Sequence, residues 1–297
     1  MVHFTRIRRT PNGTERPGRR SARRRGRRLQ PLLLLGVLGA AVAVGVSLPP
    51  TSTLSADPQP PPPQEDVVQT QAATAQSQLD TPLRLVAEAR QTYAQVSTYT
   101  CTLISQERVR GKLLPENVIS MSFRGQPFSV YMRWLGPKEF AGQEVAYVHG
   151  RNNGMMRVHA KGVLGALGFV SIAPNDPRVM EHSRHTIVEA GIGNLIERLA
   201  RSWEFERAQN KTRVQMAEYD YNQRRCTRVE TILTERTPQA YAYRTVVYFD
   251  KQWRLPVRVE CYDFPRQGGP PEGELLECFS YANLQFNMNL DDRTFSK

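Results

Sequence analysis

The chain has 297 residues, and its 40 Lys and Arg side chains outnumber its 28 Asp and Glu side chains, giving a net charge of +12. Eleven arginines and one acid lie in residues 1–28, so most of the excess charge belongs to the first tenth of the chain. The rest is almost neutral. We therefore expect no nucleic-acid partner, because phosphate binding needs a basic patch on the folded part. The composition also excludes collagen-like, coiled-coil and disulfide-dense proteins.

An uncharged apolar stretch, Leu32–Leu48, follows the arginines. As a helix it would extend roughly 26 Å, at a rise of about 1.5 Å per residue, which approaches the thickness of a bilayer core. We predict a single transmembrane or signal helix over residues 29–48. The positive-inside rule places the disordered tail 1–28 in the cytoplasm, where its arginines would contact anionic lipids of the inner leaflet.

Two interpretations of this helix stay open. An uncleaved signal anchor would hold the protein in the inner (cytoplasmic) membrane as a single-pass protein with its main domain in the periplasm. A cleaved signal peptide, cut near Ala56, would secrete that domain into the periplasm. The long arginine-rich tail favours the anchor. Both interpretations export the rest of the chain.

Residues 49–80 are rich in Pro, Gln, Ser and Thr and contain almost nothing that could form a core. This composition predicts a linker, partly in the polyproline II conformation. Residues 81–297 are long enough to form one exported domain with a substantial core.

The exported domain shows helical periodicity at two places and strand alternation between and after them. We expect one helix from Thr81, its N-cap, with Pro82 in the first turn, and a second helix from Asn194, with Leu199 and Trp203 on its apolar face. Short turns between strands imply antiparallel pairing. The prediction is an α+β fold, a large antiparallel sheet with two main helices on one side. The expected strands cover residues 119–124, 128–134, a hairpin within 144–160, 241–250, 256–264 and 276–290.

Aromatic and methionine side chains concentrate on these strands, and two interpretations fit them. They form an ordinary core, or they line an apolar cavity between a curved sheet and its helices. The glycine-rich segment 162–170 is either a buried connection or an apolar lid over that cavity. The candidate ligand-binding residues are Met121, Phe123, Met132, Trp134, Tyr147, Leu164, Leu167, Phe169 and Phe249.

Signals for catalysis or metal binding are weak. The sequence contains no Gly-x-Ser-x-Gly, His-Glu-x-x-His or P-loop motif. The Gly191-Ile192-Gly193 turn lacks the third glycine and the βαβ context of a dinucleotide site. His182 and His185 have a spacing that suits a metal only on a helix, which their context does not support. We predict no metal and no cofactor, and we expect His185 to order the loop before Gly191.

Four cysteines occur in the exported domain. Cys261 and Cys278 are equidistant from a turn at Gly269–Pro270, and in a symmetric hairpin they would face each other. Within an oxidising compartment this pair could form a disulfide. The alternative is that both are buried thiols.

Several segments together resemble an uncharacterised bacterial domain-of-unknown-function family over residues 82–297. They are Thr98–Leu103 leading to Gln106-Glu107-Arg108, Pro127–Met132, Gly142–Val145, and His185 with Gly191–Leu195. More distantly, Tyr248-Phe249-Asp250, Leu255–Glu260, Phe279–Leu284 and Leu290-Asp291 are similar to LolA/LolB-like lipoprotein carriers. That resemblance implies a strongly curved, unclosed half-barrel with helices on its concave side, over an apolar cavity.

Three hypotheses about function follow. The first is a membrane-tethered, periplasm-facing binding protein for a lipid, acyl chain or lipidated protein, although a tethered protein could not shuttle between membranes as soluble carriers do. The second is a structural or protein-interaction module with a solid core. The third, which we do not favour, is an enzyme that uses His185 and nearby carboxylates.

Overall fold

The computed structural model describes residues 77–297, except the side chains of Val163, Leu164 and Leu167. The predicted tail 1–28, the predicted helix 29–48 and the linker up to residue 76 lie outside the described residues. Among the helices within 77–297, none combines the length and the apolar character needed to cross a bilayer.

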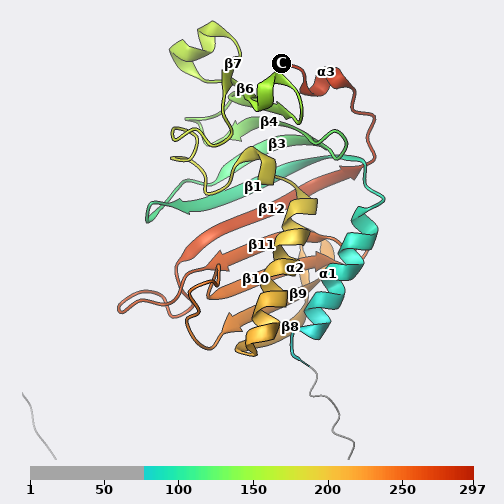
Figure 1. Ribbon diagram of the computed structural model, residues 1–297, viewed down its shortest axis with the longest axis vertical. Helices are drawn as coiled ribbons and strands as arrows, with labels where there is room; N and C mark the ends of the chain where they lie inside the picture. The colour runs from blue at the N-terminus through green and yellow to red at the C-terminus, as the bar shows by residue number, and fades with distance from the viewer. Residues whose placement is uncertain (1–76) are drawn as a thin grey trace, which may run out of the picture. The chain divides into compact units, whose positions relative to one another are not determined.

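One antiparallel sheet dominates the domain (Figure 1). Its strand order is β7-β6-β5-β4-β3-β1-β12-β11-β10-β9-β8, and the short β2 pairs only with β1. The end strands β7 and β8 do not pair, so the sheet is unclosed. The strands are β1 (Thr98–Val109), β2 (Lys112–Leu113), β3 (Asn117–Arg124), β4 (Ser129–Gly136), β5 (Glu144–Val148), β6 (Met156–His159), β7 (Val170–Ile172), β8 (Thr212–Tyr221), β9 (Arg224–Leu233), β10 (Arg244–Asp250), β11 (Pro256–Tyr262) and β12 (Leu275–Phe286).

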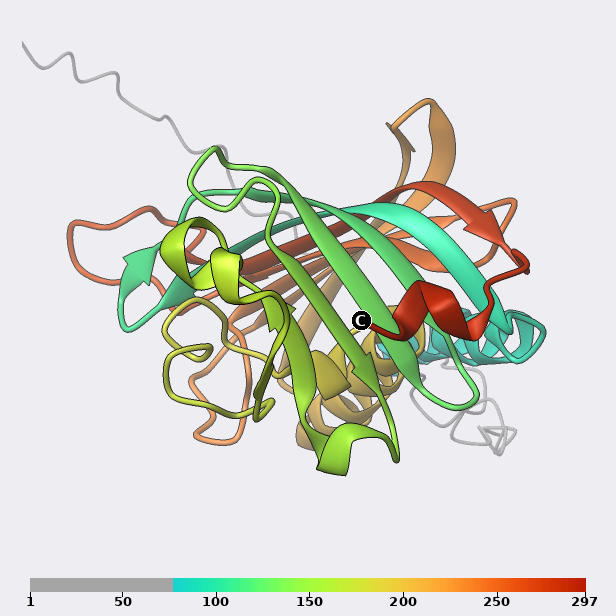
Figure 2. The same ribbon diagram turned by 90° about the horizontal axis from the view of Figure 1, so that it is seen from above.

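Two long helices, α1 (Asp80–Tyr93) and α2 (Ile192–Gln209), pack together on one face of the sheet, which curves around them (Figures 1 and 2). This confirms the expected antiparallel, unclosed sheet with helices on its concave side. The short helix α3 (Asp292–Phe295) lies beside β4 and β5. Short 3-10 segments occur at η1 (Asn152–Gly154), η2 (Gly162–Leu167) and η3 (Ile187–Glu189).

Both long helices begin earlier than the sequence pattern predicts. The N-cap of α1 is Leu79 rather than Thr81, and α2 starts at Ile192, which puts Asn194 inside the helix. Instead of capping, the Asn194 side chain donates hydrogen bonds to the carbonyl oxygens of Val188 and Ala190.

Two glycines allow α2 to begin against the sheet. Gly191 has a φ of +103°, and a Cβ there would lie 2.7 Å from the Phe123 ring. A Cβ on Gly193 would lie 2.4 Å from the ring of Tyr93 on α1. Both positions exclude a side chain, because such contacts are far inside van der Waals distance. The Gly-x-Gly pattern therefore serves close packing.

The larger of two buried apolar clusters lies beneath α1 and α2. The apolar face of α2, which includes Leu195, Leu199 and Trp203, packs there against alternating residues of the central strands. The smaller cluster lies on β5 and β6 and comprises Val145, Tyr147, Met156 and Val158.

Residues 173–190, which we call the cover segment, connect β7 to α2. Ile187 packs against both apolar clusters, Val179 against the smaller one and Ala190 against the larger one. None of residues 173–190 is fully buried. Apolar burial therefore contributes much less to holding this segment than it does to holding α2.

Of the two interpretations of Cys261 and Cys278, the disulfide does not form. Cys261 on β11 lies opposite Glu277 on β12, and Cys278 lies opposite Glu260. Successive side chains point to opposite faces of a strand, so this one-residue offset puts the two cysteines on opposite faces of the sheet. All four cysteines are buried free thiols, as the alternative interpretation held.

Candidate functional site

Two carboxylates face each other on the concave side of the sheet. Glu107 on β1 lies directly opposite Glu277 on β12, and their exposed fractions are 6% and 0%. Like charges in opposite positions repel, and buried charges need partners. The surrounding residues must therefore supply compensating charge and hydrogen bonds.

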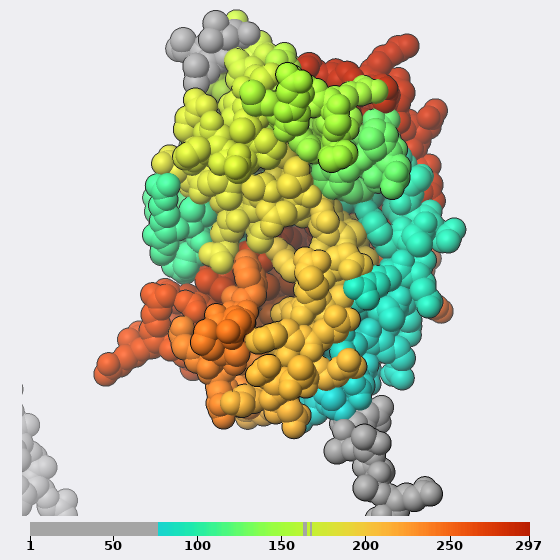
Figure 3. Space-filling model, viewed as in Figure 1, coloured from blue at the N-terminus to red at the C-terminus, as the bar shows by residue number. Residues whose placement is uncertain are grey.

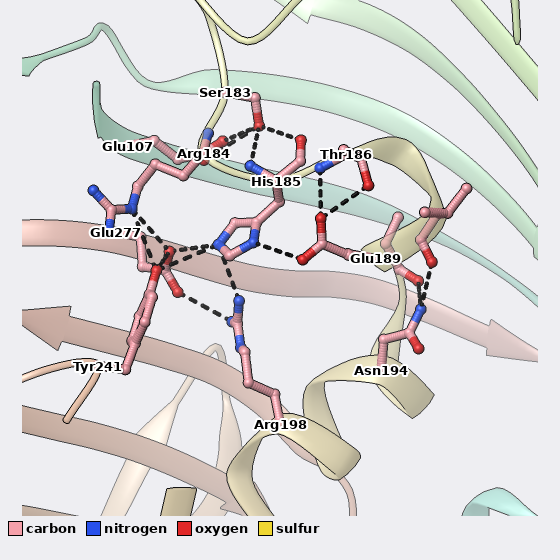
Figure 4. A network of polar contacts seen from close by, with 12 residues as sticks. Glu107, Ser183, Arg184, His185, Thr186, Glu189, Asn194, Arg198, Tyr241 and Glu277 are labelled. Atoms are coloured by element: carbon pink, nitrogen blue, oxygen red, sulfur yellow. Dashed lines mark hydrogen bonds and ion pairs between the residues drawn. The ribbon is translucent and has the colours of Figure 1, made fainter. Parts of the chain in front are cut away.

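Glu277 receives most of this compensation. One carboxylate oxygen lies 2.7 Å from Nε2 of His185, and the other lies 3.1 Å from a guanidinium nitrogen of Arg198. The Tyr241 hydroxyl donates a hydrogen bond to Glu277, and Nε of Arg184 lies 3.6 Å away (Figure 4). Burial raises the pKa of Glu277, but the His185 hydrogen bond and the Arg198 charge outweigh it, so the pKa is lowered. Glu277 is therefore ionised at neutral pH.

His185 is held between two carboxylates. Its Nε2 faces Glu277, and its Nδ1 lies 3.4 Å from Glu189. Burial lowers the pKa of His185, but the hydrogen bond and charge of Glu277 more than offset this, so the pKa is raised. The positive charge of Arg198, which has a guanidinium nitrogen 3.0 Å from Nε2, acts against this increase in the pKa of His185. A protonated imidazole donates from both nitrogens and so satisfies both acids.

Glu107 binds the same stretch of the cover segment. The Ser183 hydroxyl donates to it at 3.0 Å, and the backbone N–H of Arg184 donates at 2.7 Å. Burial raises its pKa despite these bonds. Three consecutive residues, Ser183, Arg184 and His185, thus attach the cover segment to two neighbouring strands. We call the two carboxylates and the side chains that contact them the latch. Its members are Glu107, Ser183, Arg184, His185, Arg198, Tyr241 and Glu277.

Local sequence orders the end of the cover segment. The Glu189 carboxylate accepts hydrogen bonds from the backbone N–H of Thr186 at 2.8 Å and from its hydroxyl at 2.9 Å. This reciprocal capping box fixes the 3-10 turn η3. It also holds the Glu189 carboxylate next to the His185 ring. The expectation that His185 orders the loop before Gly191 is thus confirmed by its contacts.

A cavity of about 320 Å³ adjoins the latch. Four basic side chains and no acidic side chain line it, together with two apolar residues, a serine and a tyrosine. Figure 3 shows the molecular surface hollowed between α2 and the segment before β10. The lining residues are Arg108, Val109, Arg110, Met180, Ser183, Arg184, His185 and Tyr241.

A second cavity, of about 370 Å³, lies at the β8–β9 and β10–β11 turns. Its lining includes Arg224, Arg225, Lys251 and the acid Asp250. The Arg224 guanidinium is paired with Asp250 and lies over the Trp253 ring. Charge in this cavity is therefore compensated locally.

The predicted ligand-binding residues do not lie together in an open cavity. Five of them are fully buried: Met121, Phe123, Met132 and Phe249 in the larger cluster and Tyr147 in the smaller one. Trp134 is half-buried against both clusters, and Phe169 packs on His159. The side chains of Leu164 and Leu167 are outside the described residues. None of the seven described side chains lines either cavity.

Segment 162–169 connects β6 to β7 at one edge of the sheet. The concave face near the latch is instead overlain by the following residues, the cover segment, as Figure 4 shows for Ser183–Glu189. Within residues 77–297 no group of three or more His, Cys, Asp or Glu side chains is arranged to hold a metal ion.

Residues 96–297 match the family described as a protein of unknown function, DUF1571, and the chain belongs to that family. This confirms the resemblance to a domain-of-unknown-function family. No curated protein matches the chain.

Solved structures similar to this chain include the lipoprotein LppX from Mycobacterium tuberculosis, at 11% identity and a TM-score of 0.41, covering 71% of this chain and 98% of that one. A LolA superfamily protein from Nitrosomonas europaea has 9% identity and a TM-score of 0.32, covering 72% and 96%. A DUF1329 family protein from Desulfovibrio piger has 15% identity and a TM-score of 0.36, covering 74% and 98%.

Proposed function

We propose that this protein binds a long apolar ligand, an acyl chain or another lipid-like group, between the concave face of the sheet and the cover segment. One observation carries the proposal. The cover segment contacts the smaller cluster through Val179 and Ile187 and the larger one through Ile187 and Ala190, and none of its 18 residues is fully buried. The contacts that fasten this segment are mainly polar.

A ligand that displaces the cover segment would replace few apolar contacts. The segment's apolar contacts come mainly from Val179, Ile187 and Ala190, all partly buried. Burying one CH₂ group contributes roughly 0.8 kcal/mol, so a chain of about twelve such groups would contribute on the order of 10 kcal/mol before the costs of association. Segments with few buried contacts open locally more readily than packed helices.

The proposed setting is the cell envelope. The predicted helix 29–48 would tether the domain to the inner membrane, with the arginines of residues 1–28 on anionic lipids of the cytoplasmic leaflet. The ligand would then be a membrane lipid or the lipid group of a lipidated protein on the periplasmic side. We propose binding rather than catalysis, because both ring nitrogens of His185 are engaged by carboxylates.

Binding of a fluorescent fatty acid to the full-length protein, with displacement by unlabelled lipids, tests the proposal. Hydrogen exchange would be followed in parallel. We expect saturable binding, with ligand-dependent changes of exchange in residues 173–190 and little change in α2. Absence of binding, or changes confined to α2 and the strands beneath it, would contradict the proposal.

A structural or protein-interaction module of the envelope is the second candidate. It is favoured by the burial of Met121, Phe123 and Phe249, whose exposed fractions are 1%, 4% and 3%. Such a solid interior needs no ligand. The same experiment separates the two candidates, because a scaffold would bind no lipid and its cover segment would not respond.

A further inference from the structure

We propose that the cavity beside the latch binds an oxyanion, the carboxylate or phosphate end of an amphiphilic ligand, with Arg184 and Arg108 as its principal partners and Arg110 as a peripheral one. The amphiphile part of this inference rests on the proposed function, since the apolar chain would lie under the cover segment. The oxyanion part rests on the cavity itself.

Arg184 is fixed in a position that leaves hydrogen-bond donors available. Its Nη1 donates to the carbonyl oxygen of Arg108 at 3.1 Å, and its Nε donates to the Tyr241 hydroxyl at 3.3 Å. Its guanidinium also lies 5.6 Å from the centre of the Tyr241 ring. Within residues 77–297 its Nη2 makes no hydrogen bond.

Arg108 is held in the same manner by backbone oxygens. Its Nε donates to the carbonyl of Leu275 and its Nη1 to the carbonyl of Gly111, both at 2.9 Å. Its Nη2 lies 3.7 Å from Glu274, which is too far for a hydrogen bond. Two guanidinium groups are thus positioned before any ligand arrives, and a preorganised arginine loses little side-chain entropy on binding.

The lining of the cavity is basic, although each of its three arginines also has an acid nearby outside the lining. No acid lines it, whereas the second cavity contains Asp250 beside its arginines. Glu277 lies 3.6 Å from Nε of Arg184 and Glu274 lies 3.7 Å from Nη2 of Arg108, but neither acid lines the cavity. Glu181 pairs with Arg110 at 3.2 Å, but both side chains are more than half exposed and the pair is weak. The lining therefore favours a negatively charged group.

The rest of the lining indicates that the ligand also has an apolar part. Val109 and Met180 add apolar surface to the cavity. Of the lining residues, Met180, Ser183 and Arg184 belong to the cover segment. Arg108 and Val109 are the last two residues of strand β1. The cavity therefore lies at the junction of the cover segment and the sheet. An oxyanion bound there would place an attached apolar chain at the border of the concave face.

The test compares probes that differ only in the head group. Binding of a long-chain fatty acid, the fatty alcohol of equal chain length, the corresponding alkyl phosphate and inorganic phosphate alone would be measured on the full-length protein at pH 7 and two salt concentrations. One charge-assisted hydrogen bond is worth roughly tenfold in affinity. We expect the acid and the alkyl phosphate to bind roughly tenfold more tightly than the alcohol, with the difference shrinking in salt.

Three variants test which arginines cause the difference in affinity between the acid and the alcohol. Arg184→Gln should bring the acid-to-alcohol affinity ratio close to one. Arg110→Gln, whose parent side chain is 70% exposed and pairs only with the exposed Glu181, should reduce the ratio roughly twofold. Arg225→Gln removes the same charge at the second cavity and should leave the ratio unchanged.

The outcomes distinguish this inference from the function on which it rests. If acid and alcohol bind equally and Arg110→Gln changes neither affinity, the oxyanion site is refuted while lipid binding stands. If phosphate alone binds in an Arg184-dependent manner and no amphiphile does, the oxyanion site stands and the proposed function fails. If no probe binds, both are refuted.

Discussion

The concave face of the sheet is closed in two different ways. Under α1 and α2 it is closed by packing, and Trp203, Ile192 and Ala200 are all completely buried there. Under the cover segment it is closed by the latch, in which arginine, histidine and hydroxyl groups meet two buried carboxylates. Packing resists opening in proportion to buried apolar area, whereas a polar closure can exchange its partners for those of a ligand. The second region is therefore the one suited to admit a ligand.

Truncating the helix-covered core should have the largest effect. Trp203 is completely buried, and Trp203→Ala should lower the free energy of unfolding by about 3–5 kcal/mol. The matched change in the cover segment, Ile187→Ala, should cost only about 1 kcal/mol, because Ile187 is partly buried. Denaturant unfolding followed by circular dichroism measures both. Equal costs would break the distinction between the two regions.

The helix-covered region also contains one buried acid without a cationic partner. Glu206 receives hydrogen bonds only from Ser202 and Thr212, and burial raises its pKa to about 7. A raised pKa means that its contribution to stability is present at acidic pH and is lost as pH rises through about 7. Glu206→Gln should therefore stabilise the protein by about 2–3 kcal/mol at pH 8 and by less than about 1 kcal/mol at pH 5.

Thermal unfolding across this pH range checks the Glu206 prediction. Glu204→Gln is the control, because Glu204 is exposed on the same helix. A gain that does not depend on pH, or one that the control reproduces, would show that Glu206 is not the titrating group.

The latch should respond to pH in a way that the helices do not. The pKa of His185 is raised, so its fastening of the cover segment is complete below about pH 6.5 and is lost as pH rises through the raised value. Below that pH, His185→Gln should lower the local opening free energy of residues 173–190 by about 1–2 kcal/mol. Hydrogen-exchange protection factors, corrected for the intrinsic pH dependence, measure it.

His182→Gln provides the matched control, since His182 is exposed three residues away in the same segment. Loss of protection in α2 to the same extent as in the cover segment would mean that the two regions open together, and the cover segment would not be a separately opening part of the molecule.

The smallest effect is expected at the pair that joins the two helices. Arg90 on α1 and Glu197 on α2 form a two-pronged ion pair, but their side chains are 42% and 47% exposed. Arg90→Gln should cost about 0.5 kcal/mol and less at high salt, because exposed pairs are screened. Arg84→Gln, an exposed arginine on the same helix, serves as the control in the same unfolding measurement. A much larger loss would show that charge, rather than packing, holds the helix pair.

Much of the fold was predictable because its strands alternate in polarity. The residues around Met121 and Phe123 show that alternation, whereas those around Val246 and Phe249 form a continuous buried run; both segments were expected as strands. Strand β8 was not predicted, because it lies at the edge of the sheet and most of its residues are exposed on both faces. Strand β1 was missed because its inward positions include Ser105 and Glu107, which read as polar.

The site was harder to predict than the fold. His185 was identified as a residue that orders its loop, but its partner Glu277 lies 92 positions further along the chain. The only sequence signal for Glu107 and Glu277 is an acid at an inward-facing position of an apolar strand, and that signal depends on knowing the register. The same dependence explains why the sequence left a disulfide and two thiols open at Cys261 and Cys278, because a shift of one residue in pairing moves a side chain to the other face.

The contact between Gly193 and the Tyr93 ring bears on the electrostatics of the protein. Gly193 lets α2 approach that ring on α1, and five residues later the same helix carries Arg198, a counter-charge of Glu277. A side chain at position 193 would require the Tyr93 ring or α2 to shift, and a shift of α2 would move that cation relative to its buried acid. The packing between the two helices and the charge compensation of Glu277 are thus linked through the position of one helix.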